Sequence, residues 1–398
     1  MRLLTGVIRA IAAGSLAALL TISGISGQQV RLDVDVRAWT DDVRQHEPRT
    51  LDEPARRIAS LPWTTLLPVL NEVKRRGDPD LLLLGATALL DIAVHVPLEE
   101  RPLLPKLGSS TIAEDGERRG VGVLDPHLWH ARQLVDRAVR DEMAPRHDEI
   151  RSHAIAWYRT VSAALLAANN LADLDPHIER SSRLFPDDPG ILFDAGCYVE
   201  AYASPLMQAA MFAEGEGPKP KRRVGLLQAD PRSESRLLSE AEKRFRRTIE
   251  LDPTFAEARV RLGLVLMKRG RTKDAIAELE RALALPADDE VKYYAQLFLG
   301  RAAAAEGSHA RAIEANTAAA ALFPVAQSPR LALSLLNSET VARTNDEALE
   351  GVLVRTDESE RHDPWWVYYR GSGRNEADVY RAFADRVRSI RARVRGDR

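Results

Sequence analysis

The sequence predicts an all-α protein built from repeated helix pairs, with a helical region before the repeats and a capping helix at the C-terminus. The first observation behind this prediction is an internal repeat: residues 256–263 align with residues 293–300, and both segments end in Leu-Gly. The second is a further glycine seven residues after each segment, at Gly270 and Gly307. Self-similarity of this kind is typical of a solenoid, in which each helix pair packs only on its neighbours.

The end of each unit is marked by a proline, Pro286 or Pro324. This arrangement resembles the tetratricopeptide repeat, whose unit of ~34 residues is two antiparallel helices. The resemblance implies a right-handed α-solenoid, a TPR-like superhelix. Gly263 is then expected where two helices cross closely, and the glycines at 270 and 307 at turns that need a positive φ.

The same register extends backwards and gives four units over about 155–326. Ala241 and Phe245 match the register on a second helix from about 234 to 251, and Leu192, Ala195 and Gly196 match it after Pro189. Further back, the matching residues are Leu174 and Ile178 before Pro186, and Trp157 and Tyr158. The unit that starts at Pro189 contains a long insertion, much of it polar, over about 214–235. We therefore expect one repeat to be split by a loop.

The predicted domain organisation has four parts. They are a signal peptide or N-terminal anchor (1–27), a helical region with a loop at 96–125 (28–150), the repeats (151–326), and a degenerate repeat followed by an aromatic segment and a basic capping helix (327–398). The capping helix is predicted from about 375 to 394, because Tyr380, Phe383, Val387, Ile390 and Val394 share one face.

The N-terminus is typical of an export signal. Arg2 and Arg9 supply positive charge, the run 10–25 is uncharged and mostly apolar, and cleavage is expected after Gly27. We therefore predict a periplasmic or secreted protein. The alternative is an uncleaved helix that anchors the protein to the inner membrane.

Composition excludes several classes of protein. Lys and Arg number 56 against 58 Asp and Glu, a formal net charge of -2, so no nucleic-acid partner is expected. Cys197 is the only cysteine, which rules out an intramolecular disulfide and a Cys-rich metal site. The sequence contains no Gly-x-Ser-x-Gly elbow, no Gly-x-x-x-x-Gly-Lys-Ser/Thr phosphate loop and no His-Glu-x-x-His motif. We therefore expect no enzyme activity and no cofactor.

Several clusters have both a structural and a functional interpretation. His127 and His130, three residues apart on a predicted helix, are weak metal-ligand candidates, and no metal site is predicted from them. The four aromatic residues Trp365, Trp366, Tyr368 and Tyr369 suggest either a stacking platform for peptide or sugar, or a wedge that seats the capping helix. The arginines of that helix suggest either a solvated face or peripheral membrane contact, for which the N-terminal segment is the other candidate.

The resemblance also nominates residues for a concave groove lined by the first helix of each repeat. They are Arg159, Phe193, Cys197, Arg261, Leu264, Lys268, Leu297 and Arg301. Their mixture of positive and apolar side chains suits an extended peptide or a helix with some acidic character. The function that follows is an exported scaffold or adaptor for a protein or peptide partner. The alternative is a noncatalytic envelope protein that binds a peptide or a glycan.

Overall fold

The computed structural model describes residues 73–95, 126–140, 146–168, 170–204, 231–336, 363–383 and 386. The predicted N-terminal signal, the loop at 96–125, most of the insertion at 214–235 and the end of the capping helix lie outside these residues. Within the described ranges the chain is helical and contains no strand, as predicted. None of the described helices has the length and apolar character needed to cross a membrane.

The chain divides into two compact units, one formed by 1–161 with 377–398 and the other by 162–376. The first unit contains α5 (Pro79–His95), α6 (Pro126–Ala138) and the first part of α7 (His147–Ala167). Trp157 is buried there and donates from Nε1 to the carbonyl of Ala86 at 3.4 Å. The helix that follows residue 375 groups with this unit, where Tyr380 and Phe383 are buried. Its role as a cap stays a prediction.

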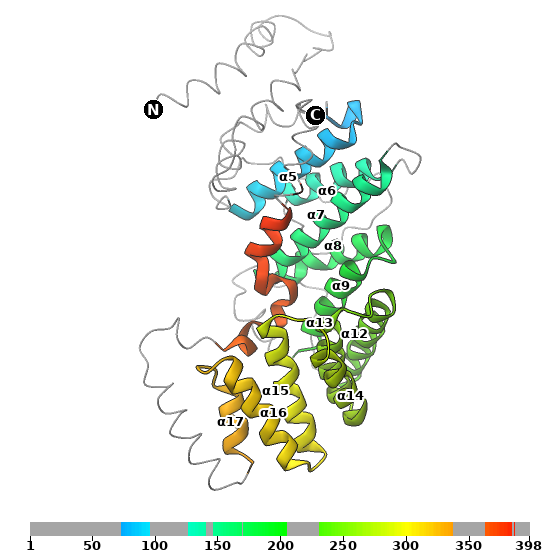
Figure 1. Cartoon of the computed structure of the whole chain (residues 1–398). Coiled ribbons are helices and arrows are strands. Elements are labelled where there is room, and N and C mark those ends of the chain that lie inside the picture. Colours follow the sequence, from blue (N-terminus) through cyan, green and yellow to red (C-terminus); the bar gives the residue numbers. More distant parts are fainter. Residues whose placement is uncertain are drawn as a thin grey trace, which may run out of the picture. The chain divides into compact units, whose positions relative to one another are not determined.

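The second unit is a stack of helix pairs (Figure 1). Its helices are α8 (Leu171–Leu184), α9 (Pro189–Tyr202), α12 (Pro231–Leu251), α13 (Ala256–Lys268), α14 (Thr272–Leu283), α15 (Asp289–Ala305), α16 (His309–Leu322) and α17 (Ser328–Ser334). Helix α9 pairs with α12, α13 with α14, and α15 with α16, and each pair also packs on the next. Helices α9 and α12 pair although they are not consecutive in the sequence, since α9 ends at Tyr202 and α12 begins at Pro231. The architecture is the predicted α-solenoid of helix pairs.

Close helix crossings depend on small residues, as the sequence predicted. A Cβ built on Gly263 would lie 2.7 Å from Leu279 of α14, and one on Gly196 would lie 2.5 Å from Phe245 of α12. Contacts this short do not occur between real side chains, so only glycine lets these helices approach so closely. These two glycines thus allow the close contact of α13 with α14 and of α9 with α12.

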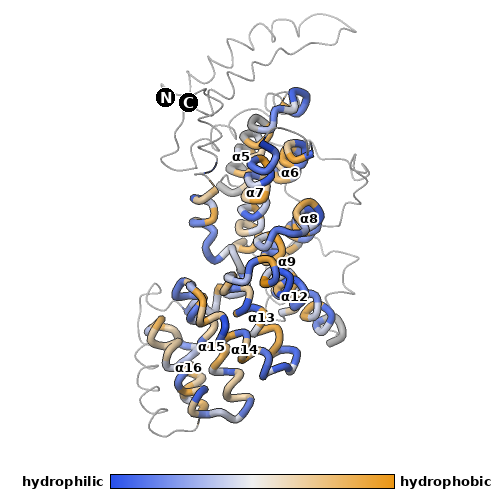
Figure 2. Tube along the Cα trace, turned by 45° about the vertical axis from the view of Figure 1, so that its right-hand side comes forward, coloured by the Kyte–Doolittle hydropathy of each residue, from blue (hydrophilic) through white to orange (hydrophobic). Residues whose placement is uncertain are grey.

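The turns between paired helices need a left-handed backbone. Gly270 and Gly307 adopt φ values of 73° and 77°, which glycine adopts without a steric penalty. Both values confirm the sequence prediction. Along α14, α15 and α16, hydrophobic and hydrophilic positions alternate over short stretches (Figure 2), and the apolar positions Ala275, Leu279 and Ala282 of α14 are buried.

The four aromatic residues belong to a 3₁₀ helix, η3 (Pro364–Asn375), which has a kink at Gly371. Asp363 begins this helix, because its carboxylate accepts a hydrogen bond from the backbone N–H of Trp365 at 3.0 Å. Short 3₁₀ helices make weaker backbone hydrogen bonds than α-helices, so tertiary contacts must hold η3 in place.

Candidate functional site

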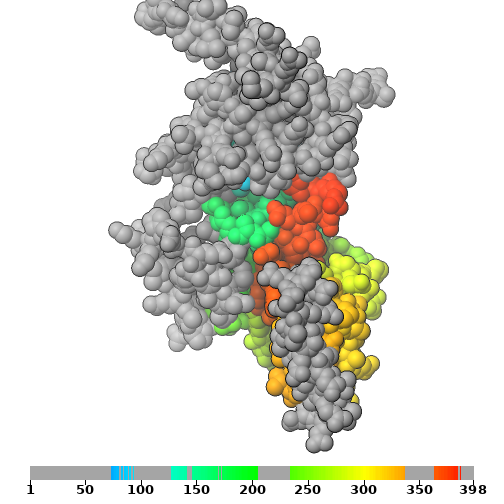
Figure 3. Space-filling model, turned by 90° about the vertical axis from the view of Figure 1, so that its left-hand side faces the viewer, coloured from blue at the N-terminus to red at the C-terminus, as the bar shows by residue number. Residues whose placement is uncertain are grey.

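The candidate site is the place where residues 363–375, named here the aromatic segment, cover the first helices of three repeats. These first helices are α9, α13 and α15, and we call the surface that they present to the segment the first-helix face. Side chains of all three helices bond or pack on the segment. Figure 3 shows part of the segment, in orange-red, at the surface beside the yellow atoms of the repeat helices.

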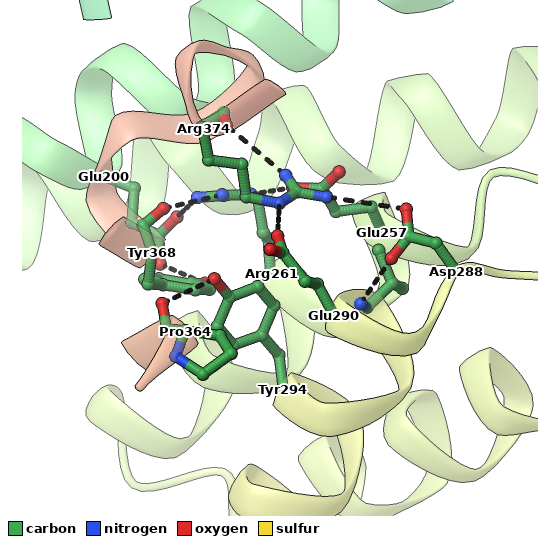
Figure 4. Close-up of polar contacts among 11 residues, drawn as sticks. Glu200, Glu257, Arg261, Asp288, Glu290, Tyr294, Pro364, Tyr368 and Arg374 are labelled. Atoms are coloured by element: carbon green, nitrogen blue, oxygen red, sulfur yellow. Dashed lines mark hydrogen bonds and ion pairs between the residues drawn. The ribbon is translucent and has the colours of Figure 1, made fainter. Parts of the chain in front are cut away.

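Arg261 of α13 is at the centre of the site, and its side chain is fully buried. Its Nη1 donates to Glu200 Oε2 and its Nε to Glu257 Oε1, both at 3.0 Å. Its Nη2 donates to the main-chain carbonyl of Tyr368 at 2.9 Å, and the guanidinium carbon lies 4.3 Å from the centre of the Tyr368 ring (Figure 4). One arginine therefore binds both the backbone and the side chain of the aromatic segment.

Glu200 of α9 completes this contact from the other side. It is buried, and its Oε1 accepts a hydrogen bond from Tyr368 Oη at 2.8 Å while Oε2 accepts from Arg261. Burial raises the pKa of the Tyr368 hydroxyl well above its usual value, with the Glu200 carboxylate adding to the effect. Tyr368 is thus held as a neutral hydrogen-bond donor at physiological pH.

Arg374, at the far end of the segment, meets a group of carboxylates. Its Nη1 donates to Glu257 at 2.7 Å and its Nε to Glu290 at 2.9 Å, and Asp288 lies 3.9 Å from Nη2. Burial alone would raise the pKa of Glu257, but Arg374 and then Arg261 outweigh it and hold that pKa below the usual 4.5. The carboxylate is therefore ionised and shared by two arginines.

The start of the segment is anchored by Asp363 and the residue after it. Tyr293 Oη donates to Asp363 Oδ1 at 2.6 Å, and the backbone N–H of Ser328 donates to Oδ2 at 2.8 Å. Tyr294 Oη donates to the main-chain carbonyl of Pro364 at 2.7 Å. Burial raises the pKa of both tyrosines. Two adjacent tyrosines on α15 thereby fix where the segment enters the site.

Cation–π contacts hold two further rings of the segment. The Arg301 guanidinium carbon lies 4.7 Å from the centre of the Trp365 ring, and Lys268 Nζ lies 5.1 Å from the centre of the Tyr369 ring. Lys268 Nζ also donates to Tyr369 Oη at 2.8 Å. Trp366 is different, because 64% of its surface is exposed. Three of the four aromatic residues therefore pack on the repeats. They do not form an open stacking platform.

Gly371 lets the segment lie directly on α9. Its φ is 53°, and a Cβ built on it would lie 3.0 Å from Cys197 Cβ. Cys197 is 1% exposed, and burial raises the pKa of its thiol well above the usual value. The single cysteine is thus a packing residue beneath the segment, held as an unreactive thiol.

The structure brings together most of the residues that were predicted to line a groove. Arg261, Lys268 and Arg301 bind the aromatic segment, and the apolar predicted residues are buried. Those buried residues are Phe193, Cys197, Leu264 and Leu297. Arg159 belongs to the other unit. Binding of an outside partner by these residues stays a prediction.

Sequence reasoning missed the acidic half of the site and its arginine. The residues concerned are Glu200, Glu257, Asp288, Glu290 and Arg374. A local signal existed only for Glu257, which precedes Arg261 by four residues on one helix. Arg374 lies 117 residues from Glu257, so no spacing rule could have joined them.

The histidine candidates lie in the first unit. Burial, with smaller contributions from Lys74 and His127, lowers the pKa of His130 to about 4, so this imidazole is neutral at physiological pH. Among the described residues, no group of three or more histidine, cysteine, aspartate and glutamate side chains is placed to hold a metal ion.

Comparison with solved structures finds matches of low sequence identity. The crystal structure of MamA matches with 19% identity and a TM-score of 0.33, over 48% of this chain and 92% of that one. TTC0263, a thermophilic TPR protein of Thermus thermophilus, matches with 16% identity and a TM-score of 0.31, over 56% and 90%. A monomeric mutant of IFIT1 with Gppp-AAAA matches with 13% identity and a TM-score of 0.40, over 89% and 67%.

Sequence comparison is more specific. No curated protein matches the chain, but the family model described as tetratricopeptide repeat matches residues 234–297. This range covers most of α12, all of α13 and α14, and α15 as far as Leu297. It includes Gly263 and Gly270, the two glycines of the first aligned unit. The chain therefore contains tetratricopeptide repeats over residues 234–297.

Proposed function

We propose that this protein is an exported, noncatalytic scaffold that binds a protein partner through the first-helix face of its tetratricopeptide repeats. The observation that carries the proposal is the binding of the aromatic segment: Arg261 and Tyr294 each donate a hydrogen bond to a main-chain carbonyl of that segment. Main-chain carbonyls are common to all peptides, and flanking side-chain contacts add specificity. This face therefore has the chemistry of a peptide-binding surface.

The alternative from the sequence, a glycan-binding envelope protein, has less support among the described residues. Sugar stacking needs open aromatic ring faces, and Trp365, Tyr368 and Tyr369 use theirs to pack on one another and on the repeats. Of the four aromatic residues, Trp366 alone is exposed. A single exposed ring is a weaker platform than the four that the sequence suggested, so we favour a protein partner.

Site-specific photo-crosslinking in cells that express the full chain tests the proposal. A photoreactive amino acid replaces Lys268, whose side chain lies at the edge of the first-helix face. The matched control replaces Arg281 of α14, a second-helix residue whose side chain is 63% exposed. Arg261 is unsuitable for such a test, because any replacement leaves the buried Glu200 without its arginine.

The expected result is one covalent adduct with a defined protein from position 268 and none from position 281. Equal adducts from both positions, or none from either, contradict partner binding at this face. A glycan array probed with the same purified chain separates the alternative: a specific glycan signal without a protein adduct favours the glycan-binding function.

A further inference from the structure

The aromatic segment occupies the surface through which the repeats are proposed to bind their partner. Resting on that proposed function, we infer that residues 363–375 are an intramolecular ligand of the first-helix face. A partner then enters this face by displacing them, with a segment of similar chemistry: aromatic residues followed by a flexible glycine turn and an arginine. The partner and residues 363–375 therefore compete for the same face.

The charges of the site define the cation that a replacement must carry. Arg374 is 2% exposed and contacts Glu257, Glu290 and Asp288. When the segment leaves, Arg261 is the one arginine among the described residues that still pairs with Glu257. Arg261 also pairs with Glu200, so the two carboxylates then share one arginine. An acidic peptide would add repulsion here, whereas an arginine restores each pair. The partner that the sequence favoured, with acidic character, is therefore disfavoured at this end of the face.

The aromatic contacts define the second requirement. The ring of Tyr368 contacts Arg261, and its hydroxyl donates to Glu200. The same ring packs edge-on against the rings of Tyr294 and Phe298, with ring centres 5.1 and 5.2 Å apart. Glu200 is fully buried. A side chain without a hydroxyl would leave one of its oxygens unsatisfied, which disfavours binding strongly. Tyrosine at this position is therefore required in any competing segment.

A competing segment would remake the ion pairs and hydrogen bonds that the resident segment gives up, and displacement is feasible for this reason. Buried ion pairs contribute little net stability, because desolvation offsets their attraction, but they discriminate strongly between matched and mismatched partners. A segment that remakes the same pairs replaces the resident one at small cost. The resident segment is favoured only by its high effective concentration as part of the same chain.

The single cysteine reports displacement without any engineered label. Cys197 lies beneath Gly371 and is 1% exposed, so a maleimide reaches it only when the segment lifts off. Labelling is measured on the full chain for the wild type, for Arg374→Gln, which weakens the segment's charged anchor, and for Trp366→Ala as the control at an exposed position. Circular dichroism melting establishes that each variant is folded.

We expect Arg374→Gln to label at least tenfold faster than the wild type and Trp366→Ala to label at the wild-type rate. A synthetic peptide of residues 363–376 added to Arg374→Gln should restore slow labelling. The same peptide carrying Tyr368→Ala and Arg374→Gln should not. If Arg374→Gln unfolds, Tyr368→Phe, which loses only the hydroxyl contact with Glu200, is used in its place.

Slow labelling of a folded release variant overturns the inference, because the segment would then be a fixed brace. Fast labelling that the wild-type peptide does not slow also overturns it, because the face would then not be a site for such a segment. Peptide protection needs no cellular partner, whereas crosslinking from Lys268 does. The failure of this inference is therefore distinguishable from the failure of the proposed function.

Discussion

Arg261 and Tyr368 are 107 residues apart in the sequence, yet the guanidinium of one lies on the ring of the other and donates to its carbonyl at 2.9 Å. This pair joins the repeats to the aromatic segment. Because the Arg261 side chain is fully buried and also bonds Glu200 and Glu257, the energetics of the site depend on it.

Arg261→Met should destabilise the protein by about 3–5 kcal/mol, because it leaves the buried Glu200 without its arginine and Glu257 with Arg374 alone. The matched variant is Arg281→Met, which removes an exposed arginine from Glu278 while Arg259 still pairs with that carboxylate, and it should cost less than about 1 kcal/mol. Urea unfolding followed by circular dichroism measures both. Similar costs for the two variants would show that Arg261 is not a buried partner of Glu200 and Glu257.

Gly263→Ala should cost about 1–3 kcal/mol, because the new methyl group overlaps Leu279. Gly270→Ala meets no atom within 4 Å, so its cost of about 1–2 kcal/mol comes from its left-handed backbone alone. Steric overlap and backbone strain can be distinguished by making both substitutions in a Leu279→Ala background. There the cost of Gly263→Ala should fall while that of Gly270→Ala is unchanged, and an equal response of both would refute the steric account.

Stability should fall as the pH drops from about 6.5 towards 4. The pKa of His130 is lowered from 6.5 to about 4 in the folded protein by burial, then by Lys74 and His127. In this window the unfolded chain binds a proton that the folded chain does not, so acid favours unfolding. The loss is on the order of 2 kcal/mol. Urea midpoints at pH 7.5 and 5 for the wild type and His130→Gln measure it, and an unchanged pH slope in the variant would contradict the assignment.

A second loss of stability is expected at lower pH. Glu257 has a folded pKa below the usual 4.5, because Arg374 and Arg261 overcome the effect of burial. Its contribution is therefore present above about pH 4.5 and is lost as the pH falls through the lower folded value. Between pH 5 and 3, the melting temperature of Glu257→Gln should fall less steeply with pH than that of the wild type. The exposed carboxylate variant Glu179→Gln is the control and should keep the wild-type slope.

Export is tested at the N-terminus. If residues 1–27 are a cleaved signal, intact-mass measurement of the protein from the envelope fraction should give a chain that begins at Gln28. Replacing the apolar residues Leu19 and Leu20 by arginine should keep the precursor in the cytoplasm, because the translocation machinery needs a continuous apolar run. A full-length chain in the membrane fraction would instead favour the uncleaved anchor.

The sequence by itself determined the helix pairs and their close crossings. The repeat of Gly263, Gly270, Gly300 and Gly307 is local and periodic, and the backbone angles and helix contacts that it predicted follow from the chemistry of one residue type at one spacing. The same reasoning placed Gly270 between α13 and α14 and Gly307 between α15 and α16. It also selected Arg261, Lys268 and Arg301 as residues of one surface.

Only the tertiary structure decided what that surface touches. The aromatic segment follows the repeats by tens of residues, and its pairs, Arg374 with Glu257 and Tyr368 with Glu200, join positions 117 and 168 residues apart. Contacts at such separations depend on how the chain folds back on itself, and they leave no periodic pattern in the sequence. The charge of Arg261 was readable from the sequence, but its neutralisation by buried carboxylates was not, because burial is a property of the packed molecule.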